Sequence, residues 1–461
     1  MRLNKSQKIV FILFAWLALS GRSCTETTIT TGLDSVQKVS DTAGNFEGVL
    51  EDNDQFGSAV ANIGDLDFDA VTDLVVGAPL DDDGGTDRGA VWILFMNDDG
   101  TVDIDQKISD SEGRLTALLQ AGLDDNDRFG SAVAELGDLN GDGILDIAVG
   151  APLDDDGGTD RGAVWILFLN TDGTVQFSQK ISDNAGFFNS VLQDNDQFGT
   201  AIAFIGDLNN DLLPEIAVGA VGDDDGGTDR GAIWILSLAA DGTVNNFQKV
   251  SDRDGNFTGT LDDSDFFGSS IAGIGDLDAD GIEDIAVGAI GDDDGGVDRG
   301  AVWVLLMNAD NTVRFEQKIS ETDGNFNGGL DDSDHFGSSV TGLGDVNGDG
   351  IIDIAAGADL DDDGGNNRGA VWIMFMESDG GIISESKISS VSGNFTGTLT
   401  DGTQFGSALA NPGDLDLDGT IDIVAGAKLD DDGGTDRGAL WTLFMKRSET
   451  DRQVTLFDDK Q

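Results

Sequence analysis

The feature that most constrains this chain of 461 residues is a unit of about seventy residues that occurs six times. One tryptophan marks each copy, and these tryptophans are Trp92, Trp165, Trp234, Trp303, Trp372 and Trp441. The first interval between them is 73 residues, and the next four are 69 residues each. A fixed period of this length indicates one supersecondary unit arrayed many times. We therefore expect six units that close into one ring, and not several independent domains.

Each copy contains four short segments with the side-chain pattern of strands. Segment 90–96 is continuously apolar, as expected of a strand buried on both faces. Segment 57–61 has small side chains, which suit the crowded axis of a β-propeller blade, and segment 106–109 is polar enough for an outer edge. Glycine and proline interrupt every candidate helix. The sequence predicts an all-β fold, a β-propeller with six four-stranded blades.

The two ends of the chain carry the strand that would close this ring. The sixth copy, 405–445, has only three strands, while segment 36–40 ahead of the first copy resembles an unpaired fourth strand. We expect closure by pairing of this N-terminal strand with the last blade. Segment 454–457 in the C-terminal tail is an alternative source of the fourth strand.

The first 24 residues resemble a secretory signal peptide. Basic residues precede an apolar run over 9–19, and small residues lead to Cys24. This run is too short to span a bilayer, which takes about twenty residues, and no later segment is apolar enough to do so. We expect a signal peptide over 1–24, the propeller over 25–446 and an acidic C-terminal tail over 447–461. The protein is predicted to be secreted or at the cell surface, with two outcomes open at Cys24, simple cleavage nearby or a lipid anchor.

The formal net charge of −63 excludes nucleic acid as a partner, because binding phosphates needs clustered Lys and Arg. A hydrophobic content of 39% is sufficient for a folded core. Self-repulsion of this size destabilises a compact state unless something offsets it. Six bound divalent cations would contribute +12 toward that offset.

Six loops have oxygen-bearing side chains at their first, third, fifth and ninth positions. They are Asp65/Asp67/Asp69/Asp73, Asp138/Asn140/Asp142/Asp146, Asp207/Asn209/Asp211/Glu215, Asp276/Asp278/Asp280/Asp284, Asp345/Asn347/Asp349/Asp353 and Asp414/Asp416/Asp418/Asp422. Alternate spacing lets a curved backbone aim each oxygen at one centre, and glycine at position six in four loops permits the turn. Hard oxygen ligands without His or Cys select Ca²⁺. The sequence predicts up to six Ca²⁺ sites, of which the third is the weakest match because Leu212 replaces glycine; Asx turns without metal are the alternative.

These motifs resemble FG-GAP repeats, the blades of the integrin alpha head. The resemblance rests on Phe56-Gly57, the aspartate loops, Gly77-Ala78-Pro79 and the Arg-Gly-Ala-Val-Trp segments, and it covers about 33–446. It implies a β-propeller with Ca²⁺ in loops on one face and partners on the opposite face. Integrin heads have seven blades, whereas this chain has six copies of the repeat. Seven blades are therefore the less favoured alternative.

Enzyme chemistry finds little support in the sequence. The only histidine, His335, occupies a slot that other copies fill with unrelated residues, and every candidate acid recurs around the repeats. The favoured function is an exported calcium-binding adhesion or binding module for protein or glycan. A carboxylate-based hydrolase or lyase that uses the propeller channel, and a structural envelope component, are the alternatives. We expect the arginine of each copy (Arg88, Arg161, Arg230, Arg299, Arg368 and Arg437) to bind aspartates of its own loop.

Overall fold

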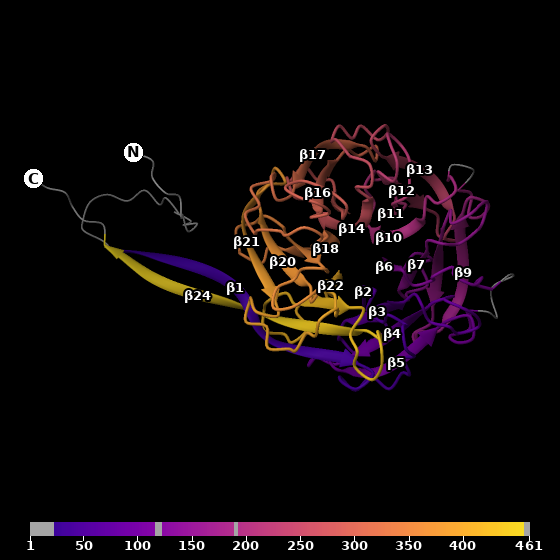
Figure 1. The fold of residues 1–461 in the computed structure, drawn as a ribbon, viewed down its shortest axis with the longest axis horizontal. Coiled ribbons are helices and arrows are strands. Elements are labelled where there is room, and N and C mark those ends of the chain that lie inside the picture. Colours follow the sequence, from indigo (N-terminus) through magenta and orange to yellow (C-terminus); the bar gives the residue numbers. More distant parts are fainter. Residues whose placement is uncertain (1–22, 116–121, 189–191, 456–461) are drawn as a thin grey trace, which may run out of the picture.

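The computed structural model describes residues 23–115, 122–188 and 192–455, and all twenty-four named elements of this part of the chain are strands. They form six antiparallel sheets of four strands each, arranged in a ring (Figure 1). The prediction of a six-bladed β-propeller is confirmed. Within the described residues, no helix has the length and apolarity needed to cross a membrane.

Within each blade the strands follow one another from the centre of the ring to its outer edge (Figure 1). Blades one to three consist of β2 (Ala59–Gly64), β3 (Asp73–Ala78), β4 (Ala90–Met96) and β5 (Val102–Ile108); β6 (Ala132–Gly137), β7 (Asp146–Ala151), β8 (Ala163–Leu169) and β9 (Val175–Ser182); and β10 (Phe198–Phe204), β11 (Glu215–Ala220), β12 (Ala232–Leu238) and β13 (Val244–Val250). Blades four to six consist of β14 (Phe267–Gly275), β15 (Asp284–Ala289), β16 (Ala301–Met307) and β17 (Val313–Ile319); β18 (Phe336–Gly344), β19 (Asp353–Ala358), β20 (Ala370–Met376) and β21 (Ile382–Ser389); and β22 (Phe405–Ala410), β23 (Ile423–Ala427), β24 (Ala439–Thr455) and β1 (Ser23–Ser40).

The ring closes through the two ends of the chain, as predicted. β1 pairs antiparallel with β24 along its length, with Ser40 opposite Ala439 and Val36 opposite Leu443. The pairing continues beyond the ring as a two-stranded ribbon, which Figure 1 shows extending away from the blades. Strand β24 therefore includes residues 447–455 of the segment predicted as a C-terminal tail, and Cys24 lies in β1. The predicted signal peptide falls, up to residue 22, outside the described residues.

The third strand of each blade is buried on both faces because it serves two interfaces at once. In β4, Val91 and Ile93 pack into the cluster shared with blade two, whereas Trp92 and Leu94 pack into the cluster shared with blade six. Alternate residues of a strand point to opposite faces, so both sets must be apolar. This explains why the segment is continuously apolar rather than alternating.

The Phe-Gly pair at the head of each copy joins one blade to the next. Phe129 is fully buried, and its backbone N–H donates to the carbonyl oxygen of Arg88 in blade one at 2.9 Å. Gly130 has φ +96°, and a Cβ there would lie 2.3 Å from the carbonyl oxygen of Ala90. Only glycine fits both the left-handed backbone and this close approach. The repeat thus encodes the spacing between blades as well as the blades themselves.

Candidate metal centres

The six predicted cation loops all connect the first strand of a blade to the second strand. Since the strands of each blade are antiparallel, every loop lies at the same end of its blade, and the six loops share one face of the ring. We call this the loop face. The connections between second and third strands, and those between blades, lie at the other end, which we call the clasp face.

In all six loops, the residues at positions four and six have a left-handed backbone conformation. In the second loop these are Gly141 at φ +78° and Gly143 at φ +89°. The third loop, the weakest sequence match, has Leu212 at φ +73° in the same place, with its side chain 89% exposed. Leucine pays a steric cost for this conformation. The loop geometry is therefore kept even where glycine is missing.

Oxygens from positions one, three and nine come together in these loops. In the first loop, one carboxylate oxygen from each of Asp65, Asp67 and Asp73 lies within 4.8 Å of the others. The same holds for the fourth and sixth loops, through the groups Asp276/Asp278/Asp284 and Asp414/Asp416/Asp422. The other three loops have asparagine at position three (Asn140, Asn209 and Asn347), so an amide oxygen stands where a carboxylate stands in the first group.

Position five is engaged differently from the other predicted ligands. The carboxylate of Asp69 accepts the N–H of Val71 at 2.8 Å, and it is not part of the three-carboxylate group. The equivalent residues Asp142, Asp211, Asp280, Asp349 and Asp418 each accept the N–H of the residue two positions later. Position five therefore shapes the turn in the structure, while positions one, three and nine converge.

Backbone N–H groups hold the converging oxygens in place. Asp138 accepts the N–H groups of Asp142 and Gly143, at 2.9 and 2.8 Å, and the Asn140 amide oxygen accepts that of Asp142 at 2.8 Å. These bonds fix the side chains before any ion enters. A preformed group of two or three hard oxygens fits a Ca²⁺ ion, which takes 6–8 oxygen ligands including carbonyls and water.

The carboxylate at position nine is buried beneath each loop. Asp73 accepts the N–H of Leu66 at 2.9 Å with one oxygen and that of Met96 at 3.1 Å with the other, so it ties the loop to the third strand. Burial raises the pKa of Asp73, Asp146, Asp284 and Asp353 to about 7 and that of Asp422 to about 6. A buried carboxylate among other acids is unfavourable in its charged form, and a cation beside it would relieve this.

Loop three differs because position nine is Glu215. One oxygen of Glu215 accepts both the hydroxyl of Ser237 at 2.5 Å and the amide N–H of Asn209 at 2.8 Å. The other accepts the N–H of Leu208 at 2.8 Å. Glu215 thus connects its loop to the third strand, as Asp73 does in loop one, but it does so through the hydroxyl group of Ser237.

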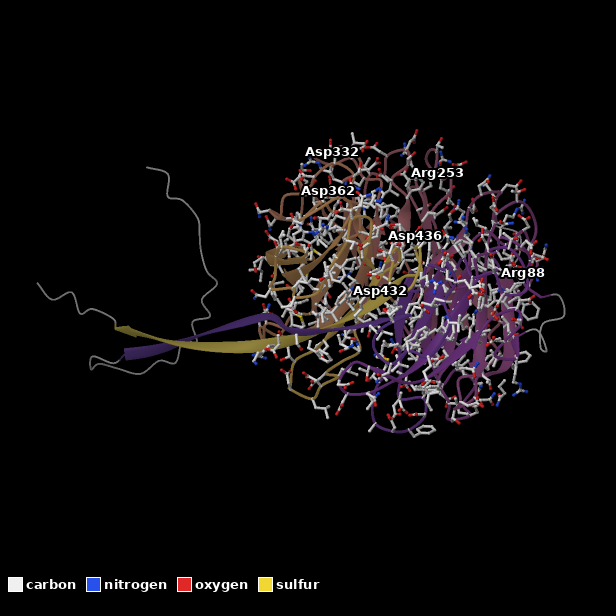
Figure 2. All side chains as sticks on the ribbon, turned by 60° about the horizontal axis from the view of Figure 1, so that its bottom comes forward. Arg88, Arg253, Asp332, Asp362, Asp432 and Asp436 are labelled. Atoms are coloured by element: carbon white, nitrogen blue, oxygen red, sulfur yellow. The ribbon has the colours of Figure 1, made fainter. Side chains whose placement is uncertain are left out.

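On the clasp face, the arginines bind aspartates, but not those that the sequence analysis favoured. Arg88 contacts Asp110 at 2.7 Å and Asp125 at 2.9 Å, both in the connection that leads to blade two. The expectation of aspartates from its own loop is therefore wrong for Arg88. Arg437 of the last blade likewise reaches Asp41 and Asp52 near the N-terminus, so the arginines tie neighbouring blades together. Figure 2 shows charged side chains all around the ring, among them Arg88.

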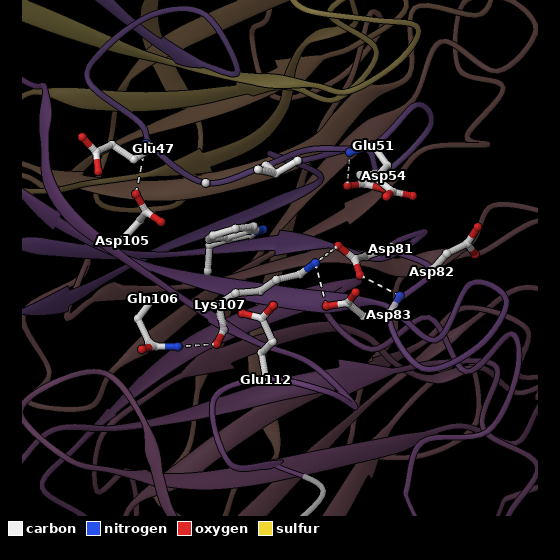
Figure 3. Close-up of a pocket in the computed structure, with 13 residues that line it drawn as sticks. Glu47, Glu51, Asp54, Asp81, Asp82, Asp83, Asp105, Gln106, Lys107 and Glu112 are labelled. Carbon is white, nitrogen blue, oxygen red and sulfur yellow. Dashed lines mark hydrogen bonds and ion pairs between the residues drawn. The ribbon is translucent and has the colours of Figure 1, made fainter.

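Sequence reasoning missed a second cation in each blade. Lys107 on the outer strand β5 lies 5.5 Å from the ring of Trp92 and bridges Asp81 at 2.6 Å and Asp83 at 2.8 Å (Figure 3). Burial opposes its charge, yet these two carboxylates outweigh burial and raise the pKa of Lys107. The other blades have the same lysine over the same tryptophan: Lys38, Lys180, Lys249, Lys318 and Lys387. The available signal was the Gln-Lys or Ser-Lys pair of the outer strand, which recurs with the same period as the tryptophans and whose lysine lies opposite the tryptophan of the neighbouring strand.

One constellation on the clasp face occurs once only among the described blades. At the position of Pro79, blade five has Asp359 and blade six has Lys428, and the Lys428 ammonium group lies 2.9 Å from Asp359. His335 Nδ1 lies 3.8 Å from the other oxygen of Asp359. The Asp359 side chain is only 6% exposed, whereas His335 and Lys428 are each 29% exposed. Side chains at equivalent positions of adjacent blades can touch only near the axis, so this group lies at the inner rim.

Comparison with known proteins identifies the repeat. Segments 56–94, 129–167 and 336–374 match the FG-GAP repeat. The chain is similar to integrin alpha-2 of Mus musculus (36% identical over 171 residues, 36% of this chain and 13% of the relative), to integrin alpha-6 of Gallus gallus (38% over 164 residues, 36% and 14%) and to integrin alpha-5 of Xenopus laevis (30% over 282 residues, 59% and 24%). The matches thus span less than a quarter of each of these relatives. The chain thus carries FG-GAP repeats on a six-bladed β-propeller, and it is similar to integrin α chains over part of its length.

Proposed function

We propose that the protein binds up to six Ca²⁺ ions on its loop face. The observation that carries this proposal is the convergence of hard oxygens from positions one, three and nine to within 4.8 Å in three loops. Asp65, Asp67 and Asp73 would hold the ion of the first loop, and the matching residues of the other loops would hold theirs. Bound calcium supplies positive charge that offsets repulsion among these carboxylates and fixes the loop.

The calcium-stabilised ring serves, in this proposal, as an exported adhesion or binding module and not as an enzyme. Two observations support it: the acidic residues recur in every blade, and the relatives are integrin α chains. We propose a secreted or cell-surface location, a signal peptide over 1–24, and cleavage or lipidation near Cys24. The partner is an extracellular protein or glycan.

We place the partner on the clasp face, opposite the loop face. A six-fold scaffold offers the same surface six times, and specific recognition needs a place where the repeats differ. The inner rim supplies such a place. At the position of Asp359 and Lys428, the other blades have proline, valine or isoleucine, and at the position of His335 they have glutamine, arginine or phenylalanine. An ammonium and an imidazole group at a rim of acidic loops give a ligand a defined point of contact.

The experiment is an array of extracellular proteins and glycans probed with the purified full chain in millimolar Ca²⁺ and in excess chelator. We expect retention in calcium only, and weaker retention of the variants Lys428→Ala and His335→Ala, with Gln55→Ala as the matched control at the histidine position of blade one. Conversion of a polysaccharide would instead support the hydrolase. Equal retention with and without calcium would contradict a calcium-dependent module.

A further inference from the structure

The fourth cation loop differs from the other five in having a basic side chain against its carboxylates. The guanidinium group of Arg314, the second residue of outer strand β17, contacts Asp278 and lies 3.1 Å from Asp280. These two carboxylates, through hydrogen bonding with Asp278 first, raise the pKa of Arg314 further above its usual value. No other ion pair among the described residues involves a cation-loop carboxylate.

This contact changes the side chain at position three. In five loops, the oxygen of position three accepts the N–H of position five, at 2.8–3.2 Å. In the fourth loop, Asp280 donates its N–H to Asp276 at 2.9 Å, and Asp278 has no such bond. One oxygen of Asp278 meets Arg314, and the other is buried without a hydrogen-bond partner. Arg314 has therefore taken over a carboxylate that elsewhere belongs to the loop.

The arginine is also singular in the sequence. The residue that follows the first valine or isoleucine of the outer strand is Asp103 in blade one, Gln176 in blade two, Asn245 in blade three and Ile383 in blade five. None of these can supply a positive charge to its loop. Blade one is the informative comparison, because its loop has the same four aspartates as that of blade four.

We propose that Arg314 is a built-in counterion that competes with Ca²⁺ for the fourth loop, so this loop fills at a higher calcium concentration than the others. The inference rests on the proposed calcium binding. An entering ion must displace the guanidinium group from two carboxylates, and any guanidinium group that stays nearby repels the ion. Because the Arg314 side chain is 40% exposed, the ion pair weakens calcium binding only modestly, and we expect roughly two- to fivefold weaker binding.

The arrangement makes blade four a graded calcium sensor within an otherwise saturated ring. At low calcium the loop is closed by its own arginine and the other five loops hold ions. At high calcium the ion replaces the guanidinium group beside Asp278, and Arg314 is released to solvent on the loop face. The unpartnered oxygen of Asp278 is available for the ion when this happens.

The test is hydrogen exchange of the full chain across a calcium titration, followed separately in peptides that contain 65–73 and 276–284. The two loops report in the same molecule, so folding and concentration are matched. We expect the midpoint of protection for 276–284 to lie at roughly two- to fivefold higher calcium than that for 65–73. The variant Arg314→Gln should bring the two midpoints together, and Asp103→Arg should move that of 65–73 upward.

Coincident midpoints in the natural chain, or an unchanged gap in Arg314→Gln, would overturn the role of Arg314 while leaving calcium binding intact. Absence of any calcium-dependent protection in both peptides would instead overturn the calcium proposal on which the inference rests. Thermal unfolding in excess chelator controls for stability. There, Arg314→Gln should unfold close to the natural chain, because a half-exposed ion pair contributes little.

Discussion

Both faces of the ring carry several aspartates in each blade, but these aspartates have opposite surroundings. On the clasp face, Lys107 lies between Asp81 and Asp83 and Arg88 between Asp110 and Asp125, so the chain supplies its own cations. On the loop face, Asp65, Asp67 and Asp73 converge, and no lysine or arginine among the described residues pairs with them. One face is neutralised by cations of the chain itself, whereas most carboxylates of the other face would need a cation from outside for this.

This difference indicates that two sources of positive charge stabilise such an acidic ring. Internal cations act under all conditions, whereas the loops, under the proposed calcium binding, would stabilise the blades only when calcium is present. Substituting the lysines or arginines of one face tests this difference, because it shows whether calcium still stabilises the fold. Blade four, where Arg314 supplies an internal cation to the loop face, is the natural intermediate between the two.

The largest effect is expected from loss of an internal lysine. Lys107→Met keeps the aliphatic stem over Trp92 but leaves Asp81 and Asp83 without their cation. Removing one partner of a buried ion pair costs about 3–5 kcal/mol, because the other charge stays buried. Thermal unfolding should show this loss equally in calcium and in chelator. The control Lys446→Met, whose partner Asp34 is 51% exposed, should unfold like the natural chain.

A second effect concerns pH. Burial raises the pKa of Asp127 from its usual 3.8 to about 7, and the neighbouring Asp154 adds to the shift. Since the folded value lies above the unfolded value, this residue costs stability as pH rises from about 4 to about 7. Asp127→Asn should remove the cost, worth on the order of 2–4 kcal/mol, and make unfolding in chelator less dependent on pH.

Blade six provides the control for this pH effect. Thr403 stands at the position of Asp127, and its hydroxyl oxygen accepts the N–H of Thr400 at 3.1 Å, as Asp127 accepts that of Asp124 at 2.8 Å. The position therefore requires an acceptor and not a charge. Thr403→Asp should add a pH dependence of the same sign, and a flat profile in that variant would contradict the assignment.

A smaller effect is expected from a single loop ligand. Asp414→Asn keeps one oxygen, which can accept the N–H group of Asp418, but its amide nitrogen cannot accept that of Gly419, and a carboxylate is lost from the cluster with Asp416 and Asp422. In chelator the variant should lose about 1 kcal/mol through that hydrogen bond. In calcium at ten times the dissociation constant it should lose about 1.4 kcal/mol more than in chelator. A loss in calcium no larger than the loss in chelator would assign Asp414 a structural role only.

The smallest effect should come from the clasp at the ring closure. Arg437 lies 2.9 Å from Asp41 and 3.0 Å from Asp52, residues from the opposite end of the chain. Arg230 makes the equivalent contacts, with Asp252 and Asp263, within a continuous segment. Each arginine pairs with one exposed aspartate and one partly buried aspartate, so Arg437→Met should lower the melting temperature less than Lys107→Met does. Protease digestion should nevertheless release the β1 segment faster than in Arg230→Met, because only Arg437 secures a chain end.

Much of the fold could be predicted from the sequence because its determinants are local and repeated. The tryptophan spacing gave the blade count, the continuous apolar run of β4 marked the strand shared by two interfaces, and segment 36–40 revealed the closing strand. The loop positions were equally visible, since their spacing is fixed by the turn. Leu212 made the third loop a weaker match in sequence, but the loop has the same backbone as the others. Tertiary structure imposes the left-handed conformation that the leucine side chain disfavours.

What could not be predicted depends on contacts between distant positions. The pairing of Arg88 with Asp110 and Asp125 requires knowing how the connection to blade two folds back, and nearby aspartates in its own loop were equally plausible by spacing. The meeting of His335, Asp359 and Lys428 depends on the ring bringing blades five and six together at the axis. The reach of Arg314 to Asp278 likewise crosses the blade from its outer strand to its inner loop.

The most direct test of the account is thermal unfolding of the full chain in millimolar Ca²⁺ and in excess chelator. We predict a markedly higher melting temperature in calcium, lost on chelation and restored when calcium is returned, because among the described residues the carboxylates of five of the six loops pair with no lysine or arginine. Lys107→Met should lower both melting temperatures by the same amount. Identical melting of the natural chain with and without calcium would contradict the claim that the loop face depends on an external ion.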